Sequence, residues 1–238
     1  MRRLLILALL ASVAFAAYPN LQLAYRFQNS ALDWSGNGRN GTVKGSGVYT
    51  TARGQQALYF EGNDYVATPS FGLSGTVVVF AAWVRCKAFT NYQLILGEAT
   101  VSTTIGYLAC VRNLNTNNLW WEYADGTSRQ YPTAVGYFNS PFDDAWLHMT
   151  IVCDYAGKNV YFYRNGILFY SVGMVGTPRF PSTNRAKYVG AFWTVSLPYY
   201  LTDGYLANVQ LWTLATMPPL AQMTANANRL MLGMNPIW

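Results

Sequence analysis

Apolar and polar positions alternate with a period of two along most of the chain after residue 16, and turn-forming residues separate the runs. This alternation is typical of strands with one buried face. It predicts strands over residues 77–86, 105–111, 119–123 and 147–154, and a hairpin that joins residues 159–163 to 167–171. Asn165-Gly166 closes the hairpin, because both residue types accept the positive φ angles of a tight turn. The pattern predicts an all-β fold, a two-sheet antiparallel β-sandwich.

The C-terminal region carries the one helical signal that follows the first sixteen residues. It begins at Met217-Pro218-Pro219, where proline is tolerated in a first turn, and runs toward Leu230 before Gly233. We therefore predict a short C-terminal helix on the sandwich. The apolar tail of residues 235–238 is predicted to dock either on the domain or on a partner.

The first sixteen residues follow a different pattern, in which Arg2 and Arg3 precede an apolar run from Leu4 to Ala16. A charged start, a short apolar run and a small-residue end are typical of a secretory signal peptide. As a helix, the run would span about 20 Å, too short for the roughly 30 Å core of a bilayer. A stable transmembrane anchor is therefore not expected. The alternative is an uncleaved apolar N-terminal arm that packs on a neighbouring subunit. Residues 17–238 are predicted to form a single domain.

Composition supports the β class and limits the partners. Of the 238 residues, 52% are hydrophobic and 11% are charged, and 18 Tyr, 12 Phe and 8 Trp favour pleated, half-buried surfaces. Removal of Arg2 and Arg3 with a leader lowers the formal net charge from +6 to +4. The other arginines are scattered singly, without the basic stripe that neutralises a phosphate backbone, so nucleic acid is not an expected partner.

The chain contains three cysteines, Cys86, Cys110 and Cys153, which is too few for a disulfide framework. Each lies on an alternating apolar segment, which favours small buried hydrophobic side chains. In an oxidising compartment one disulfide could form and leave one thiol free, and no sequence rule selects among the three pairings.

Six short motifs occur in an order that resembles a known family. A strand at residues 23–27 leads to the loop Asp33-Trp34-Ser35-Gly36-Asn37-Gly38-Arg39-Asn40-Gly41, and Phe60-Glu61-Gly62 follows. Later come Ala82-Trp83-Val84, Trp146-Leu147-His148, Tyr163-Arg164-Asn165-Gly166 and Gly204-Tyr205-Leu206. Together they resemble the concanavalin A-like lectin/glucanase superfamily and, within it, the laminin G-like domains. The resemblance implies a jelly-roll sandwich and does not specify one activity.

Catalytic chemistry is weakly supported, and no catalytic residue is predicted. The polysaccharide-cleaving enzymes of the resembled superfamily present paired carboxylates in an E-x-D-x-x-E run, which this chain lacks. The nearest candidates, Glu122 and Asp125, would point to opposite faces of a continued strand. His148 is the only histidine, and its neighbours Thr150 and Val152 indicate a half-buried sheet residue rather than a general base.

One loop is a candidate for a metal site. Asp33, Asn37 and Asn40 supply a carboxylate and two carboxamides, and calcium prefers several oxygen ligands. The resemblance implies an acidic residue in the late strand, where this chain has Ala207 and Asn208, and this difference weakens the metal interpretation. The alternative is that Asp33 makes an Asx turn with nearby backbone N–H groups.

Clustered aromatic residues are the remaining candidates for recognition. On one strand, Trp121 and Tyr123 share a face and Trp120 takes the other. Exposed aromatic rings with polar tips suit stacking on sugar faces or protein contacts, although about half of these rings are expected to fill the core. The predicted ligand-binding residues are Trp120, Trp121, Tyr123, Tyr131, Trp193 and Tyr199.

These observations predict a non-enzymatic, carbohydrate-binding protein that is secreted or displayed on a surface, with a glycan or a surface protein as its partner. The alternative is a structural, decoration or adhesion subunit of a cell-surface, appendage or virion assembly that self-associates through the N-terminal arm or the C-terminal tail. A polysaccharide hydrolase or lyase is a third, less favoured hypothesis. Calcium is the one cofactor considered.

Overall fold

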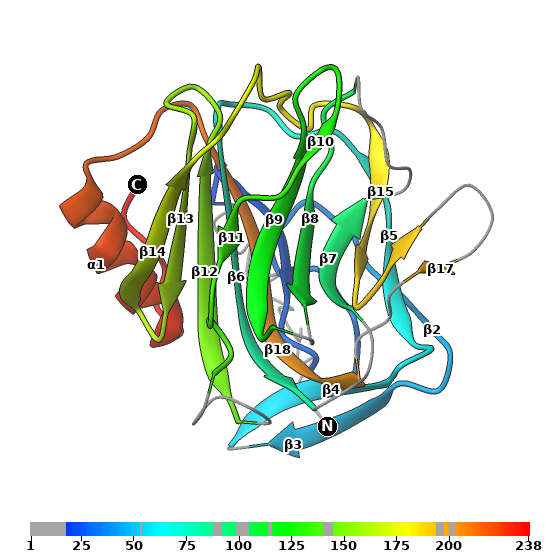
Figure 1. Cartoon of the computed structure of the whole chain (residues 1–238). Helices are drawn as coiled ribbons and strands as arrows, with labels where there is room; N and C mark the ends of the chain where they lie inside the picture. Colours follow the sequence, from blue (N-terminus) through cyan, green and yellow to red (C-terminus); the bar gives the residue numbers. More distant parts are fainter. Residues whose placement is uncertain are drawn as a thin grey trace, which may run out of the picture.

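Two antiparallel sheets packed face to face, with one helix on the outside, make up the described part of the chain (Figure 1). The computed structural model describes residues 18–52, 54–87, 92–98, 105–113, 116–139, 145–193, 198–199 and 203–238. The predicted leader, residues 1–16, lies outside the described residues. The predicted two-sheet sandwich with a short C-terminal helix is confirmed.

Sheet A has the order β14-β13-β12-β6-β18-β4-β3, and β1 also pairs with β18. Its strands are β1 (Leu21–Tyr25), β3 (Val48–Ala52), β4 (Gln55–Glu61), β6 (Val77–Cys86), β12 (Leu147–Asp154), β13 (Asn159–Arg164), β14 (Ile167–Gly173) and β18 (Asp203–Leu214). Sheet B has the order β10-β9-β8-β7-β15-β5-β2, and β11 also pairs with β9. Its strands are β2 (Thr42–Lys44), β5 (Tyr65–Phe71), β7 (Gln93–Glu98), β8 (Ala109–Asn113), β9 (Asn118–Ala124), β10 (Arg129–Gln130), β11 (Thr133–Ala134) and β15 (Arg185–Val189).

The predicted strand positions agree closely with the structure. The first and fourth predictions coincide with β6 and β12, and the predicted strand at 105–111 begins later, as β8. In the β13–β14 hairpin, Asn165 and Gly166 have φ angles of 51° and 77°, as the turn prediction requires. A small separate hairpin joins β16 (Phe192–Trp193) to β17 (Pro198–Tyr199).

The main core lies between the two sheets and is filled by the inward residues of alternating strands. Phe80 on β6, Met149 on β12 and Trp121 on β9 all belong to it. The indole Nε1 of Trp121 donates to the Tyr155 hydroxyl at 3.3 Å, so this large ring is both buried and hydrogen-bonded. The aromatic surplus of the sequence is therefore used largely inside the sandwich.

An ion pair is enclosed in sheet B. Lys187 Nζ on β15 lies 2.7 Å from Glu98 Oε1 on β7, and both side chains are fully buried. Lys187 Nζ also donates to the carbonyl oxygen of Phe71 at 2.7 Å. Burial raises the pKa of Glu98 to about 7 although the Lys187 charge opposes the shift, and burial lowers the pKa of Lys187.

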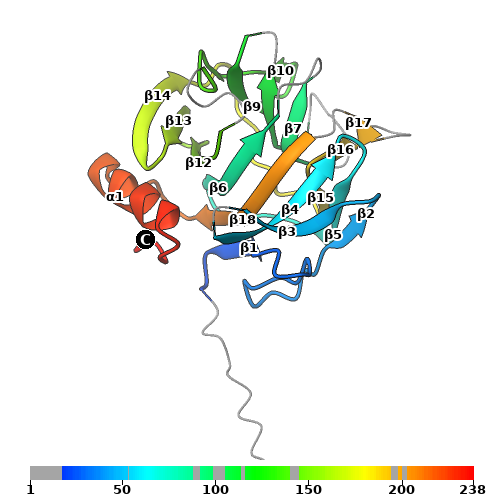
Figure 2. The ribbon, with the colours of Figure 1, turned by 90° about the horizontal axis from the view of Figure 1, so that it is seen from below.

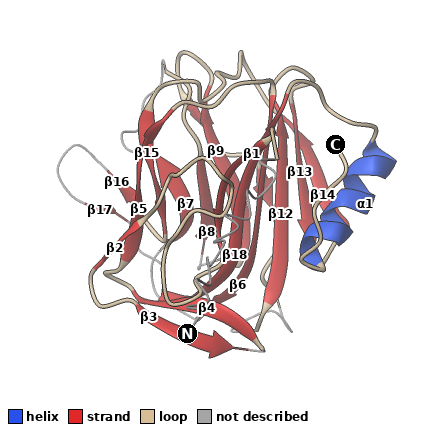
Figure 3. Cartoon of the chain, turned by 180° about the vertical axis from the view of Figure 1, so that it is seen from behind, coloured by secondary structure: helices blue, strands red, loops and turns tan. Residues whose placement is uncertain are grey.

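Helix α1 (Leu220–Met231) lies on the outer face of sheet A (Figures 2 and 3). A second core forms beneath it. The buried helix residues Met223, Ala227 and Leu230 recur at the spacing of one helix face and join Val79 and Trp212 of the sheet. Because β12 is covered on both faces, by the core between the sheets and by the core beneath α1, all eight of its residues are buried, which explains its nearly continuous apolar sequence. Among the described residues, no helix has the length and hydropathy needed to cross a bilayer.

The C-terminal tail docks on its own domain. Asn226 on α1 donates to the Ile237 carbonyl oxygen and accepts from the Ile237 N–H, both at 2.8 Å. Arg229 Nε donates to the Asn235 carbonyl oxygen at 2.7 Å, and the Trp238 ring meets the Trp212 ring edge-on at 5.7 Å. Of the two docking modes left open by the sequence, the structure shows the one on the domain.

His148 on β12 is more buried than predicted, with 1% of its surface exposed and its ring edge-on to Trp83 at 5.3 Å. Burial lowers its pKa to about 3, so the ring is neutral at physiological pH and does not suit a general base exposed to substrate. The three cysteines are buried, as the favoured interpretation expected. Burial raises the pKa of the Cys110 and Cys153 thiols.

Candidate functional site

A cavity of about 420 Å³ opens on the outer face of sheet B, where β9 meets β10 and β11. We call it the aromatic pocket. It is lined by Tyr92, Trp120, Glu122, Arg129, Tyr131 and Thr133. Trp120 pairs across the sheet with Thr133 on one side and Val111 on the other, so neighbouring strands bring these side chains to one place. Buried Leu94, Ala109 and Val111 support the Trp120 ring from below.

Alternation along β9 decides which of the predicted aromatic residues reach this pocket. Trp120 points outward and is partly exposed. Trp121 and Tyr123 point inward and have no exposed surface, so the prediction that they bind a ligand is wrong. Their rings fill the space between the sheets, and burial raises the pKa of Tyr123 to about 12.

Two tyrosine rings of the pocket lie against the Trp120 ring. The Tyr92 ring lies 5.2 Å from the Trp120 ring at an interplanar angle of 52°, and the Tyr131 ring lies 5.8 Å away at 68°. Each tyrosine ring is therefore tilted against the Trp120 ring rather than stacked flat on it. Tyr92 and Tyr131 are exposed, at 37% and 42% of their surface. The arrangement offers ring surface together with hydroxyl groups.

A carboxylate lies beside the rings. Glu122 Oε1 accepts from the Tyr107 hydroxyl at 2.5 Å and from Arg129 Nη1 at 3.3 Å. Arg129 pairs across the sheet with Ala124. Ala124 lies two residues after Glu122 and on the same outward face, so the Arg129 guanidinium lies at the rim of the pocket. Burial raises the pKa of Glu122, while the Tyr107 hydrogen bond and the Arg129 charge oppose that shift.

Sequence reasoning identified part of this pocket and missed part of it. Trp120 and Tyr131 were predicted as ligand-binding residues, and the structure brings them together. Tyr92, Arg129 and Thr133 were missed, and Glu122 was considered only as a catalytic candidate. A charged residue inside an apolar strand, between Trp121 and Tyr123, was the signal that could have marked Glu122 as part of a site.

Glu122 and Asp125, the two carboxylates considered as catalytic candidates, have different hydrogen-bond partners. Asp125 Oδ1 accepts from the N–H groups of Thr127 and Ser128 at 2.8 and 2.7 Å, and these bonds hold its pKa well below the usual range. Its Oδ2 accepts from Gln130 Nε2 at 2.8 Å. Asp125 therefore organises the turn after β9. Glu122 is the one carboxylate among the described residues that line the aromatic pocket.

Trp193 and Tyr199 were also predicted as ligand-binding residues. Their backbones form part of the β16–β17 hairpin, and their side chains lie outside the described residues. Their role in ligand binding stays a prediction.

The loop predicted to bind calcium is held by its own hydrogen bonds. Asp33 Oδ1 accepts from the N–H groups of Ala24 and Ser35 at 3.0 and 2.9 Å, and Oδ2 accepts from Ser35 Oγ at 2.8 Å and Arg39 N–H at 2.9 Å. Asn40 Oδ1 accepts from the Asp33 N–H at 2.9 Å, and Asn37 Nδ2 donates to the Leu21 carbonyl oxygen at 2.7 Å.

These contacts suit the Asx-turn interpretation. A cation at Asp33 would have to replace several N–H and O–H donors that already use the carboxylate oxygens. Among the described residues, no group of three or more His, Cys, Asp or Glu is placed to hold a metal. Calcium at this loop stays a prediction from the sequence.

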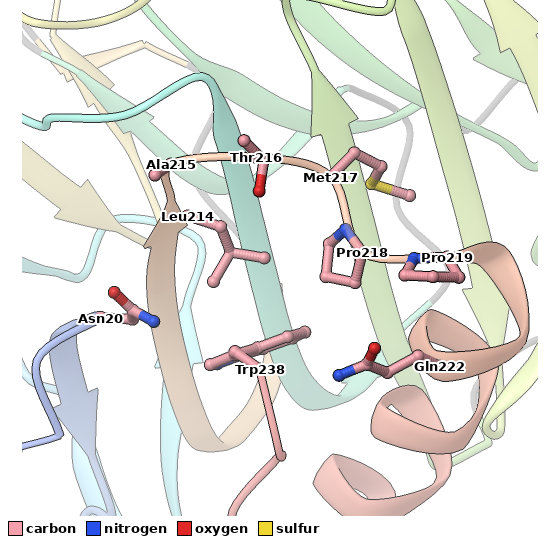
Figure 4. Close-up of a pocket in the computed structure, with 9 residues that line it drawn as sticks. All are labelled: Asn20, Leu214, Ala215, Thr216, Met217, Pro218, Pro219, Gln222 and Trp238. Atoms are coloured by element: carbon pink, nitrogen blue, oxygen red, sulfur yellow. The ribbon is translucent and has the colours of Figure 1, made fainter.

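A second cavity, of about 380 Å³, lies beside the start of α1 (Figure 4). Leu214, Pro218 and Trp238 line it, and the Trp238 indole extends into its middle. Its described lining contains no charged side chain. Gln222, which also lines it, donates to the Ile237 carbonyl oxygen at 2.8 Å. This cavity is therefore bounded by the docked tail, and it offers fewer groups for selective recognition than the aromatic pocket.

Solved structures of the same fold include domains from carbohydrate-related and receptor-binding proteins. Domain 4 of a GH43 extracellular arabinanase from Geobacillus stearothermophilus, in complex with arabinotriose, is 18% identical with a TM-score of 0.67, over 89% of this chain and 98% of that chain. The receptor-binding domain of botulinum neurotoxin mosaic serotype C/D is 13% identical with a TM-score of 0.66. The ligand-binding domain of botulinum neurotoxin serotype D, in complex with N-acetylneuraminic acid, is 13% identical with a TM-score of 0.63.

The two neurotoxin comparisons cover 90% of this chain and 51% of the toxin domains, so this chain spans about half of their length. At these identities the likeness shows the fold alone. No curated protein matches the sequence. The family profile described as the concanavalin A-like lectin/glucanases superfamily, of laminin G type, matches residues 60–219, which is more than half of the 238 residues. The chain therefore belongs to the concanavalin A-like lectin/glucanase superfamily, as a laminin G-like domain.

Proposed function

We propose that this protein is a non-enzymatic carbohydrate-binding module and that the aromatic pocket is its glycan site. The observation that carries the proposal is the partly exposed Trp120 ring beside two exposed tyrosines and the Glu122–Arg129 pair. Sugar rings present C–H faces that stack on aromatic rings and hydroxyl groups that exchange hydrogen bonds with polar side chains. The pocket offers both kinds of contact within one cavity.

The size and rigidity of the pocket support this proposal. Its volume of about 420 Å³ lies within the range of roughly 300–1,000 Å³ that is common for ligand sites. The Trp120 ring is supported by buried side chains of β7 and β8, so little conformational entropy would be lost when a ligand binds. The comparisons add that an arabinanase domain of the same fold was solved with arabinotriose.

A binding role is favoured over hydrolysis because of the acids in the site. Glycoside hydrolases commonly use two carboxyl groups that flank the scissile bond, as acid and as nucleophile or base. Glu122 lines the pocket, whereas the hydrogen bonds of Asp125 commit it to its own turn. We therefore propose that Glu122 binds hydroxyl groups and performs no acid catalysis.

An extracellular or surface location is part of the proposal, and it rests on the signal-like pattern of residues 1–16. The buried thiols are compatible with it. Reaction with oxidants requires an accessible thiolate, and Cys110 and Cys153 are buried with raised pKa values.

The test is binding to a panel of immobilised polysaccharides and oligosaccharides with purified wild-type protein and Trp120→Ala. We expect the substitution to weaken binding by about tenfold or more, because a central tryptophan anchor contributes about 2 kcal/mol or more. Trp120→Phe keeps a ring and should retain part of the affinity. Tyr170→Ala is the matched control, since Tyr170 is 43% exposed on β14 of the other sheet and should leave binding unchanged.

The same binding assay should be followed by analysis of the bound glycan for cleavage products. Glycan binding that is insensitive to Trp120→Ala would contradict the placement of the site. Release of shorter oligosaccharides that stops with Glu122→Gln would show an enzyme instead of a binding module.

The second candidate function is that of an adhesion or decoration subunit of a surface assembly. The observation that favours it is a group of exposed apolar residues beside the docked tail: Leu232 at 65%, Met234 at 42% and Ile237 at 62%. Sedimentation analysis of wild-type protein and of the double substitution Leu232→Ser with Ile237→Ser would test it. Self-association that disappears in the variant would favour the subunit, and a monomer in both would count against it.

A further inference from the structure

The two carboxylate oxygens of Glu122 have different surroundings. Oε1 accepts both protein hydrogen bonds, from Tyr107 and from Arg129. Among the described residues, no donor reaches Oε2. The Glu122 side chain keeps 8% of its surface exposed, and the residue lines the aromatic pocket, so this remaining exposure is directed into the cavity. The pocket therefore contains a carboxylate oxygen that can accept a further hydrogen bond.

The charges around this oxygen favour a neutral donor. Arg129 is the cation that lines the pocket, and it is already paired with Glu122 at 3.3 Å. Its charge is thus compensated before any ligand arrives. A carboxylate on a ligand would approach Glu122 in a partly buried site, where repulsion between like charges is stronger than in water. A sugar hydroxyl would instead donate to Oε2 without adding charge.

The aromatic rings of the pocket favour the same class of ligand, an uncharged sugar. The faces of Tyr92 and Trp120 present negative π density, which favours the polarised C–H groups of a sugar and disfavours an anion. The Arg129 guanidinium lies over the Tyr131 ring, 5.7 Å from its centroid. The three rings and the Glu122 carboxylate lie within one cavity, so one sugar could contact both.

We infer that the aromatic pocket selects neutral, hydroxyl-rich sugars and rejects sugars that carry a carboxylate. This inference rests on the proposed glycan-binding function and names the class of glycan. Glu122 is the residue that sets the selectivity, Oε2 is the atom that receives the sugar hydroxyl, and Trp120 supplies the stacking surface. A terminal sialic acid or a uronic acid places its charge against the Glu122 carboxylate and is excluded.

The experiment compares matched ligands on the full chain. A glycan array would present arabino-, xylo-, gluco- and galacto-oligosaccharides beside uronic-acid forms and forms that end in N-acetylneuraminic acid. The neutral oligosaccharide with the strongest Trp120-dependent signal would then be prepared in three forms: the parent, the terminal uronic acid and its methyl ester. Affinities for the three would be measured by calorimetry at pH 7.4 and low ionic strength.

We expect the acid form to bind about tenfold or more weakly than the parent, because a like charge is brought close to Glu122. The methyl ester removes the charge and keeps the added group, so its affinity should return to within about threefold of the parent. Glu122→Gln should lower affinity for the neutral parent by about tenfold, the order expected for loss of a hydrogen bond to a charged acceptor. The same variant should also narrow the difference in affinity between the neutral parent and its acid form.

The outcomes separate this inference from the function on which it rests. Wild-type protein that prefers carboxylated glycans, with binding lost in Trp120→Ala, would overturn the inference and leave glycan binding intact. Equal weakening by the acid and the methyl ester would show a steric effect and would also overturn it. Absence of binding to every glycan on the array would overturn both proposals. The comparison of parent, acid and ester uses wild-type protein alone, so it decides the inference even where Glu122→Gln fails to fold.

Discussion

The outer face of each sheet carries a tryptophan, and the two tryptophans differ in how far other segments cover them. On sheet A, Trp212 points outward and is covered by α1 and Trp238, so that 1% of its surface is exposed. On sheet B, Trp120 also points outward, and it lies beside Tyr92 and Tyr131 in an open cavity. A ring on the outer face of a sheet is thus a core residue or a site residue according to what covers it, and the covering segment can come from a distant part of the sequence.

The largest expected effect tests this comparison directly. Trp212→Ala should destabilise the fold by about 3–5 kcal/mol, because it leaves a cavity beneath α1. Trp120→Ala removes the same side chain from the open face and should cost less than about 1 kcal/mol. Urea unfolding of both variants, followed by circular dichroism, provides the measurement. Equal losses for the two variants would contradict the distinction between a covered and an open face.

The acid stability of the covered face is the second prediction. The folded state keeps His148 neutral with a pKa of about 3, whereas in the unfolded chain the histidine takes up a proton below about 6.5. The stability contributed by the neutral ring is complete above pH 6.5 and is lost progressively as the pH falls toward 3. Between pH 6.5 and 4.5 the loss should be about 2–3 kcal/mol.

The measurement is the free energy of unfolding from pH 7.5 to 4.5 for wild-type protein and for His148→Gln. Glutamine does not titrate, so the variant should show a shallower loss of stability over this range. The carboxylates act equally in both proteins, and the difference between the two curves isolates His148. Parallel curves would show that His148 gains a proton in the folded state without cost.

The third prediction concerns the tail that helps to close sheet A. Asn226→Ala removes both hydrogen bonds to Ile237 and should destabilise the protein by about 1–3 kcal/mol. Carboxypeptidase should then release Trp238 faster than from wild-type protein. Gln222→Ala is the control, because it removes one bond to the same carbonyl and should have a smaller effect. Unchanged release in Asn226→Ala would mean that the Trp238–Trp212 contact alone holds the tail.

The smallest expected effect belongs to the open face. Tyr107→Phe removes the hydroxyl that donates to Glu122 Oε1 and should cost about 1 kcal/mol. Because that hydrogen bond opposes the effect of burial, its loss should raise the pKa of Glu122 further. Titration of the Glu122 carboxyl carbon by NMR would detect the shift. A lowered or unchanged pKa would show that solvent replaces the hydroxyl at no cost.

The hydrophobic periodicity was sufficient to predict the strands and to assign Trp120 to the face opposite Trp121 and Tyr123. Alternation separated Trp120 from Trp121 and Tyr123 correctly, because side chains on a strand point to opposite faces. It could not tell which face was enclosed, and for that reason two of these three rings were wrongly assigned to ligand binding. The helix was placed to within a few residues, since the two prolines before Leu220 favour a helix start.

The rest of the pocket depends on strand register, which the sequence does not show. Tyr107 and Glu122 are 15 residues apart and meet through the pairing of β8 with β9. Arg129 returns to the same face through the turn that Asp125 organises. The family motifs that were recognised lie in the scaffold and in its turns, whereas Glu122, Tyr92 and Arg129 belong to no such motif.

The enclosed Glu98–Lys187 pair limits how this sequence can change over generations. Loss of either partner alone leaves an uncompensated charge inside the sandwich, which costs about 3–5 kcal/mol, whereas replacement of both by apolar residues can be nearly neutral. Descendant proteins are therefore expected to inherit the pair intact or to lose it as a unit, so that positions 98 and 187 vary together.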